Sequence, residues 1–317
     1  MMLPILTDQR ALLPFMDLGA IAPGDFVAWY NDHRQEIDNV LLDKGVVKFH
    51  GVQIAAAEDF QHICDAIGSK FLSYIDGNSP RIKLSGNVYT STEYDPAQRI
   101  TMHNELSYSA KWPGRLFFSC IQPALTGGET LLADSREILR QMDPAIVDEI
   151  EKRGITYIRN LHSGEGMGPS WQDTFETTSK EQLERYCRQY NIAFEWTDNG
   201  HLRLLQSAPG ISMHRQTGER IWFNQIDQFH PSHLGEEMYE TMGIIYGTPD
   251  QFPMYVRYGD GKDISGSVVL DILHTIEAVT IAPAWEKHEL LIVDNELVAH
   301  GRNSYTGERK VLVAMSE

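Results

Sequence analysis

The chain has 317 residues, a length that suits either two domains or one β barrel with helical additions. Its 27 basic and 44 acidic residues give a formal net charge of −17, which argues against a protein that binds nucleic acid or an anionic membrane. No apolar run reaches the roughly 18 residues of a membrane helix. The start of the chain lacks the charged and apolar segments of a signal peptide, so we expect a cytoplasmic location.

Apolar spacing predicts two N-terminal helices, Asp25–Val40 and Ala55–Gly68, with the strand Gly45–Gly51 between them. Two strands rich in β-branched and aromatic residues follow, Ile82–Thr92 and Ile100–Tyr108. Leu116–Ile121 has the composition of a further core strand. These segments place the first strands of the core before residue 135.

The middle of the chain, from Ser135 to about Val279, mixes helix-like segments with loops. Ser179–Gln189 is one such helix, and Asp143-Pro144 begins another, because Asp is a good N-cap and Pro suits the first turn. We expect this region to be an insertion over the mouth of a barrel, where substrate selectivity would lie.

The C-terminal part returns to strands. Leu290–Asp294 has the pattern of a buried strand, Asn295 begins a turn, and Leu297–Arg302 resumes an extended pattern. A turn at Thr306–Glu308 then leads into a last strand, Arg309–Met315, so that Arg309 returns beside His300.

Three cysteines, Cys64, Cys120 and Cys187, are odd in number and widely spaced. That pattern is typical of free thiols in a reducing compartment rather than of a disulfide framework. We expect them to be small buried hydrophobic side chains and assign them no role.

The triplet His103-Asn104-Glu105 carries chemistry only in its context, because composition alone predicts about one or two His-x-acid triplets. In a strand, residues i and i+2 share a face, so His103 and Glu105 would project side by side. With a distant His300 they supply two imidazoles and a carboxylate, which can hold Fe(II) and leave three positions open for a 2-oxo acid and O2. The far carboxylate of that acid needs a planar cation, which Arg309 provides.

At this point the residues resemble a known family. His103-x-Glu105, Thr126 to Thr130 (TGGET), His300-Gly301-Arg302 and Gly307-Glu308-Arg309 are similar in order and spacing to the TauD/TfdA-like Fe(II)/2-oxoglutarate dioxygenases. The stretch from His103 to Tyr108, with Trp222 to Gln225 and Phe229-His230, looks most like the SyrP-like and clavaminate synthase-like branch, which includes amino-acid hydroxylases of natural-product pathways. The likeness covers roughly residues 40 to 315.

The resemblance implies an α+β fold with a mainly β core, a double-stranded β-helix of the cupin-like, jelly-roll type. N-terminal helices and a large helical and loop insertion would decorate it. We expect a single domain over residues 1–317, with N-terminal elements in 1–80 and first core strands with His-x-Glu in 81–135. The insertion and lid region would fill 136–285, and the C-terminal core strands with the distal His and Arg would fill 286–317.

The resemblance also implies roles. His103, Glu105 and His300 would bind iron and form the catalytic centre, while Thr130 and Arg309 would bind 2-oxoglutarate. Val313 stands four residues after Arg309, where the taurine enzyme has a second Arg, and this departure puts a sulfonate substrate in doubt. Relatives that halogenate replace the carboxylate with a small residue, so the presence of Glu105 favours hydroxylation, or desaturation or cyclisation, with release of succinate and CO2.

The expected substrate is a small molecule, an amino acid or a derivative, and an Arg beside an acid or amide is the pattern that would bind an amino acid. The chain has no dense basic cluster to dock an acidic carrier protein, so we favour a free over a carrier-tethered substrate. A cupin-like Zn(II) or Mn(II) hydrolase or isomerase and a non-catalytic binding protein remain alternatives. Seven residues are substrate-binding candidates: Asn104, Ser107, Tyr108, Arg203, Asn224, Gln225 and Arg302.

Four other histidines, His162, His214, His230 and His233, have the sequence context of surface or hydrogen-bonded structural residues. His230 and His233 have the spacing of zinc ligands, but no pair of cysteines accompanies them. We therefore expect none of the four to bind a metal.

Overall fold

A computed structural model of the chain describes residues 6–8, 13–71, 75–77, 83–91, 94–166 and 168–317. The described chain is a mixed α/β structure with most of its regular elements in sheets. The largest sheet has eight strands in the order β1-β2-β3-β16-β7-β19-β5-β4, antiparallel except for the parallel pair β2 and β3. In that order the strands are Leu6–Asp8, Leu13–Ile21, Val46–Val52, Glu289–Asp294, Arg115–Gln122, Lys310–Ser316, Val88–Thr90 and Lys83–Ser85.

A smaller sheet of three antiparallel strands, β6 (Ile100–His103), β17 (Val298–Arg302) and β9 (Thr130–Asp134), packs against the inner face of the large sheet. Side-chain alternation explains why central strands such as β16 are apolar throughout. Leu291 and Val293 face the small sheet, while Leu290 and Ile292 face the N-terminal helices. The short pair β8 (Thr126–Gly127) and β18 (Tyr305–Thr306) continues this side of the core.

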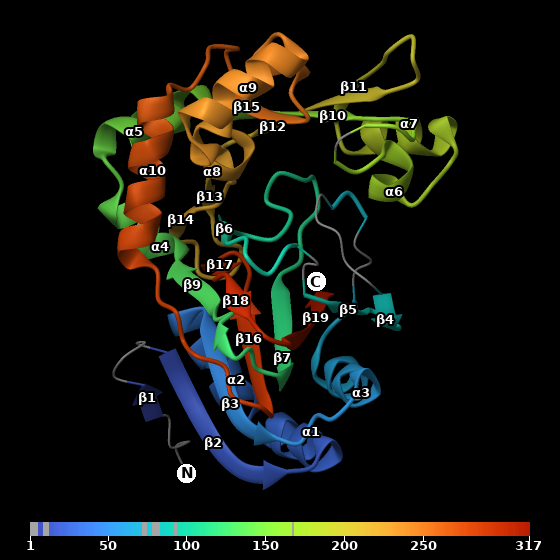
Figure 1. Ribbon diagram of the computed structural model, residues 1–317. Helices are drawn as coiled ribbons and strands as arrows, with labels where there is room; N and C mark the ends of the chain where they lie inside the picture. Colours follow the sequence, from blue (N-terminus) through green and yellow to red (C-terminus); the bar gives the residue numbers. More distant parts are fainter. Residues whose placement is uncertain (1–5, 9–12, 72–74, 78–82, 92–93, 167) are drawn as a thin grey trace.

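Three N-terminal helices cover the outer face of the large sheet and lie at the bottom of Figure 1: α1 (Pro23–Asp32), α2 (Arg34–Lys44) and α3 (Ala57–Ile67). The predicted single helix Asp25–Val40 is wrong in two respects. It breaks at His33, whose Nδ1 contacts the Trp29 carbonyl at 2.8 Å, and it continues to Lys44. It ends at Gly45, because a φ of 72° suits a glycine after a helix.

The middle region forms the upper half of Figure 1 and is less helical than the sequence predicted. A four-stranded antiparallel sheet runs through it in the order β11-β12-β10-β15: Ala193–Trp196, Leu202–Ala208, Ile155–Leu161 and Met254–Tyr258. The hairpin β13 (Ile211–Met213) and β14 (Arg220–Trp222) lies below it. The prediction of a helical and loop insertion is therefore wrong, because the region also contains a sheet. A segment such as Ile155–Leu161 forms a strand by pairing with segments far away in the sequence, which its own residues do not reveal.

Two helix predictions in this region are confirmed. The Asp143 side chain caps α5 (Pro144–Arg153), and the Ser179 side chain caps α7 (Lys180–Gln189). The remaining helices are α4 (Ser135–Gln141), α6 (Trp171–Phe175), α8 (Ile226–Phe229), α9 (Glu236–Tyr246), α10 (Gly266–Val279) and the 3-10 turns η1 (Pro231–Leu234) and η2 (Pro249–Gln251).

Several other predictions can be compared with the described residues. The predicted strand Ile82–Thr92 is two short strands, β4 and β5, joined by a turn, and its ends Ile82 and Thr92 lie outside the described residues. Cys64, Cys120 and Cys187 are free and buried, as expected, and burial raises the pKa of the Cys120 thiol to about 12. Within the described ranges no helix is long and apolar enough to span a membrane.

Candidate active site

Two histidines face each other across neighbouring strands of the small sheet. His103 of β6 pairs directly with His300 of β17, and their ring centroids are 4.3 Å apart. The Nδ1 atom of His103 lies 2.9 Å from the Thr101 carbonyl, which can only accept, so Nδ1 carries the hydrogen. The Nε2 atom then presents a lone pair, which is the form of imidazole that binds a metal.

Glu105 completes the group, but from a turn rather than from a strand. The predicted strand Ile100–Tyr108 is wrong beyond His103, where β6 ends, because the chain turns over residues 105–108 and Leu106 has a φ of 57°. The Glu105 side chain is nevertheless buried, and one of its oxygens lies 3.7 Å from His300 Nε2.

The three side chains fit a metal ion. One ligand atom from each of His103, Glu105 and His300 lies within 4.8 Å of the other two. A buried carboxylate between two imidazoles is costly without a cation, and two nitrogens with one oxygen are the donor set that suits non-heme Fe(II).

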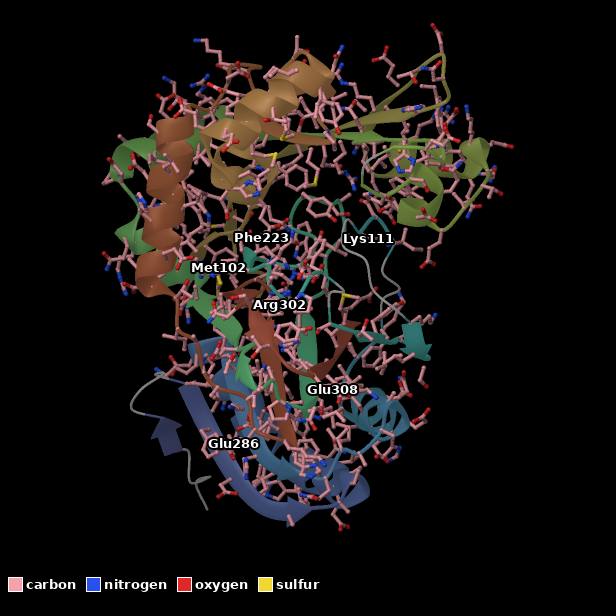
Figure 2. All side chains as sticks on the ribbon, in the orientation of Figure 1. Met102, Lys111, Phe223, Glu286, Arg302 and Glu308 are labelled. Atoms are coloured by element: carbon pink, nitrogen blue, oxygen red, sulfur yellow. The ribbon has the colours of Figure 1, made fainter. Side chains whose placement is uncertain are left out.

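A small cavity, here called the arginine cavity, lies beside this group and is named for the two arginines in its lining. Arg302 and Arg309 line it with Thr130, Ser91, His103 and His300. Figure 2 marks Arg302 near the centre of the molecule, between the core strands and the upper region. Two guanidinium groups in one cavity favour an anion with more than one carboxylate.

Arg309 is held in a fixed place. Its Nε donates to the Gly128 carbonyl at 2.8 Å, and its Nη1 donates to Ser91 Oγ at 3.0 Å. Burial, and then repulsion from Arg302, lower the pKa of Arg309 to about 10. A bound anion would relieve both costs. Opposite, the hydroxyl of Thr130 accepts from Trp285 Nε1 at 2.9 Å, which leaves its hydrogen to donate.

A second cavity of about 450 Å³, here called the large cavity, lies on the other side of the histidines. His103 and Glu105 form part of its wall, and two predicted candidates, Tyr108 and Gln225, line it. Several of its other lining residues were not predicted: Gln98, Arg99, Gln228, Phe229, His233 and Met254. Gln98 and Arg99 could have been found as two long polar side chains directly before the strand that carries His103, while Phe229 entered the sequence analysis only through the family resemblance.

Three other predicted substrate residues, Asn104, Ser107 and Arg302, form hydrogen bonds with residues or segments that line the large cavity. Gln225 Nε2 donates to the Asn104 carbonyl at 2.8 Å and to Ser107 Oγ at 3.2 Å, and both of these residues are buried. Arg302 Nη2 donates to the carbonyls of Asp95 and Gln98, at 3.0 and 2.9 Å, so it fixes the segment before β6 as well as lining the arginine cavity.

Two predicted substrate residues lie elsewhere. Arg203 forms an ion pair with Asp250 at 3.0 Å, and Asn224 Nδ2 donates to the Gly210 carbonyl at 2.6 Å. In the part of the chain that the structure describes, neither side chain lines the large cavity or the arginine cavity. His233 does line the large cavity, as a polar side chain outside the three-residue group.

Comparisons with known proteins agree with this chemistry. The family model of the taurine catabolism dioxygenase TauD, TfdA family matches residues 9–315. The dapdiamide synthesis protein DdaC of Enterobacter agglomerans is 35% identical over 279 residues, 88% of this chain and 84% of DdaC. A clavaminate synthase-like protein of Arabidopsis thaliana is 28% identical over 301 residues, 92% of this chain and 87% of the relative.

Solved structures share the fold at low sequence identity. PvcB of Pseudomonas aeruginosa matches with a TM-score of 0.53 and 13% identity over 99% of this chain and 94% of its own. Another structure of PvcB describes it as an iron- and α-ketoglutarate-dependent oxygenase from an isonitrile synthetic pathway. AAD-2, solved with Mn(II) and N-oxalylglycine, matches with a TM-score of 0.55 and 13% identity over 100% of this chain and 97% of its own.

The family match spans nearly the whole chain, and it sets aside the alternatives of a zinc or manganese hydrolase or isomerase and of a non-catalytic barrel. The cofactor and cosubstrates of this family are Fe(II), 2-oxoglutarate and O2. The chain belongs to the TauD/TfdA family and is an Fe(II)- and 2-oxoglutarate-dependent dioxygenase.

Proposed function

We propose that the enzyme hydroxylates an unactivated carbon of an amino acid, or of a small molecule derived from one, and releases succinate and CO2. The observation that carries this proposal is that His103 lines both cavities. A metal bound by His103 would therefore meet the cosubstrate from the arginine cavity and the substrate from the large cavity. This arrangement would hold the cosubstrate and the substrate next to the same metal ion.

The proposed ligands of Fe(II) are His103, Glu105 and His300. When bound, iron supplies the activation of O2 that is coupled to decarboxylation of 2-oxoglutarate. Arg309 and Thr130 would bind the distal carboxylate of 2-oxoglutarate, the guanidinium by charge-assisted hydrogen bonds and the hydroxyl by one more. We propose that the eight-stranded sheet and the three-stranded sheet, which pack against each other, correspond to the two halves of the expected jelly roll.

For the substrate, the structure offers the pairing of an arginine with an acid. Arg99 lines the large cavity, and its Nη1 lies 2.5 Å from a carboxylate oxygen of Glu277 on α10. We propose that Arg99 binds the carboxylate of an amino acid and that Glu277, which pairs with Arg99 from outside the lining of the cavity, holds the guanidinium in place. The glutamines that line the same cavity, Gln98, Gln225 and Gln228, would bind other polar groups of the substrate.

We favour a free substrate over one attached to a carrier protein. The rim of the large cavity at Leu234 leads directly into α9, whose first turn carries Glu236 and Glu237. An acidic carrier would be repelled by these carboxylates and by the net charge of −17. The relative DdaC takes part in dapdiamide synthesis, which supports a role in natural-product biosynthesis.

Among oxidative outcomes, hydroxylation is favoured over halogenation because the carboxylate of Glu105 is present. Desaturation or cyclisation would use the same residues and cavities, since the outcome depends on which substrate atoms lie beside the metal.

The test is a panel of free amino acids under anaerobic conditions with Fe(II) and 2-oxoglutarate. We expect at least one amino acid to change the metal-to-ligand absorption band, and the same compound to give one succinate per hydroxylated product when O2 is admitted. Turnover of an aminoacyl carrier protein without turnover of any free amino acid would contradict the choice of a free substrate.

A further inference from the structure

Glu105 is the proposed ligand that no strand holds in place. The ladder of β6 ends at His103, and the bonds within the following turn run from Ser107 N to the Asn104 carbonyl, 3.1 Å, and from Ser109 N to the Leu106 carbonyl, 2.8 Å. Neither bond involves Glu105 itself. Hydrogen bonds to the Glu105 main chain from another segment would help keep its carboxylate beside His300.

The side chain of Asn295 meets that need. Its Oδ1 accepts from the Glu105 N–H at 2.7 Å, and its Nδ2 donates to the Glu105 carbonyl at 3.0 Å and to the Pro113 carbonyl at 2.9 Å. Asn295 is completely buried, so these bonds are not exposed to competing water. The amide thus pairs with both main-chain groups of Glu105, as a neighbouring strand would.

The main chain of Asn295 is fixed in turn. Its N–H donates to the Gly114 carbonyl at 2.9 Å, and its carbonyl accepts from Asn104 Nδ2 at 2.7 Å. Asn295 also lies in the turn between β16 and β17, five residues before His300. One short turn therefore connects the strand that carries His300 with the main chain that carries Glu105.

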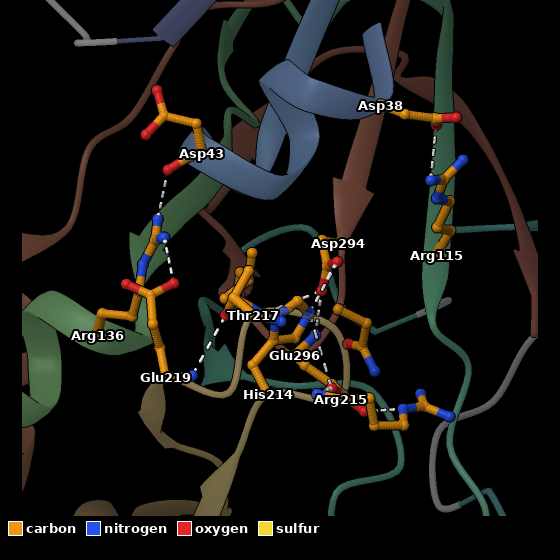
Figure 3. Close-up of polar contacts among 12 residues, drawn as sticks. Asp38, Asp43, Arg115, Arg136, His214, Arg215, Thr217, Glu219, Asp294 and Glu296 are labelled. Atoms are coloured by element: carbon orange, nitrogen blue, oxygen red, sulfur yellow. Dashed lines mark hydrogen bonds and ion pairs between the residues drawn. The ribbon is translucent and has the colours of Figure 1, made fainter. Parts of the chain in front are cut away.

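Neighbouring charges hold this turn, as Figure 3 shows. The Oδ1 atom of Asp294 accepts from the main-chain N–H groups of Glu296 and Leu297, and its Oδ2 lies 3.3 Å from His214 Nε2. The carboxylate of Glu296 accepts from Trp112 Nε1 at 2.7 Å and forms an ion pair with Arg215. Each carboxylate beside Asn295 is thus bound to a partner from another segment.

We propose that Asn295 is a positioning residue that sets the Glu105 carboxylate relative to His103 and His300. The inference rests on the metal ligands proposed above. Asn295 would contact neither metal nor substrate, because its side chain bonds to the main chain of Glu105. Its role is that of a partner which orients a ligand, and loss of such a partner typically lowers metal affinity by roughly 10- to 100-fold.

The test compares Asn295→Ala with Asn160→Ala, a matched control. Asn160 also donates two side-chain hydrogen bonds to main-chain carbonyls, of Asp250 and Phe252, but it lies in the four-stranded sheet. Fe(II) affinity is measured by anaerobic titration, with the absorption band of the 2-oxoglutarate complex and the melting temperature of the metal-free protein. We expect both variants to melt earlier, and only Asn295→Ala to lose about 10-fold or more in Fe(II) affinity and to shift the band.

Wild-type affinity and an unshifted band in Asn295→Ala would overturn the inference. If the alanine variant does not fold, Asn295→Asp, which keeps the acceptor for the Glu105 N–H and loses the amide donor, is measured instead with the same two outcomes. A parallel Glu105→Ala variant separates the two proposals. Unchanged Fe(II) affinity in Glu105→Ala would refute the ligand assignment, whereas loss there with none in the Asn295 variant refutes only the positioning role.

Discussion

The two cavities beside the histidines are built from different kinds of structure. The arginine cavity is lined largely by strands, with Thr130 on β9, His300 and Arg302 on β17, and Val313 on β19. The large cavity is lined mainly by α8, η1 and the segment before β6. The register of paired strands fixes which side chains lie next to one another, whereas turns and short helices can change in length and direction. Most residues of the arginine cavity thus lie on the ladder, whereas Glu105 and the segments of proposed selectivity lie in turns and short helices.

Substitution of His103, which lines both cavities, should have the largest effect. We expect His103→Ala to abolish succinate release and product formation together, because one of three proposed ligands is lost. Both products and Fe(II) binding are measured. His233→Ala is the control, since His233 lines the large cavity without belonging to the metal group. Wild-type turnover in His103→Ala would refute the iron site.

Changes in the arginine cavity should affect the cosubstrate and not the substrate. We expect Arg309→Ala to raise the KM for 2-oxoglutarate by roughly 100-fold, since a charge-assisted pair is lost, and to leave the KM for the amino acid nearly unchanged. Arg203→Ala serves as the control, because Arg203 lines neither cavity within the described residues. Equal changes in both constants would mean that the two cavities do not act separately.

The converse change is made in the large cavity. We expect Arg99→Gln to raise the KM for the amino acid by about 10-fold and to leave the KM for 2-oxoglutarate unchanged, because Arg99 lines only the large cavity of the two. Glu277→Gln removes the ion-pair partner of Arg99 and should raise the same KM by less. Unaltered kinetics in both variants would remove this pair from the substrate site.

A smaller effect should appear in stability beneath the large cavity. Asp227 of α8 is buried, and burial, only partly offset by the main-chain N–H groups of Asp227 and Gln228, raises the pKa of its carboxyl group to about 7. A raised pKa means that the folded protein holds a proton the unfolded chain has released, so stability is lost as pH rises through about 7. We expect the melting temperature to fall by a few degrees between pH 5.5 and 8.5, and Asp227→Asn to flatten this dependence. An identical slope in the two proteins would exclude Asp227 as its source.

The sequence predicted the arginine cavity better than the large one. His300 and Arg309 lie in or next to strands whose apolar pattern could be recognised, and a short turn returns one to the other, whereas Thr130 was predicted from the family resemblance alone. The prediction failed at Glu105, because alternation in the sequence does not show where a ladder ends. The main chain of Glu105 is bound instead by the side-chain amide of Asn295, almost two hundred residues away.

The large cavity could not be predicted for a similar reason. Phe229, His233 and Met254 come from α8, η1 and β15, and β15 is paired with β10, about a hundred residues earlier in the chain. The strands of that sheet are short and half-polar, so their identity depends on partners from other segments. Arg203 and Asn224 were plausible in sequence because they are polar and belong to the insertion, but their own partners hold them away from both cavities.

Within residue 105, the side chain of Asn295 bonds to the main-chain N–H and carbonyl groups and not to the side chain, which bears on how the enzyme could evolve. Because the Glu105 side chain takes no part in these bonds, another amino acid at this position would keep the same backbone trace and break no rung of the sheet. The side chain of the third proposed ligand can thus change without loss of the hydrogen bonds that hold its main chain. A Glu105→Gly enzyme supplied with chloride would be the natural starting point for engineering a new reaction on this scaffold.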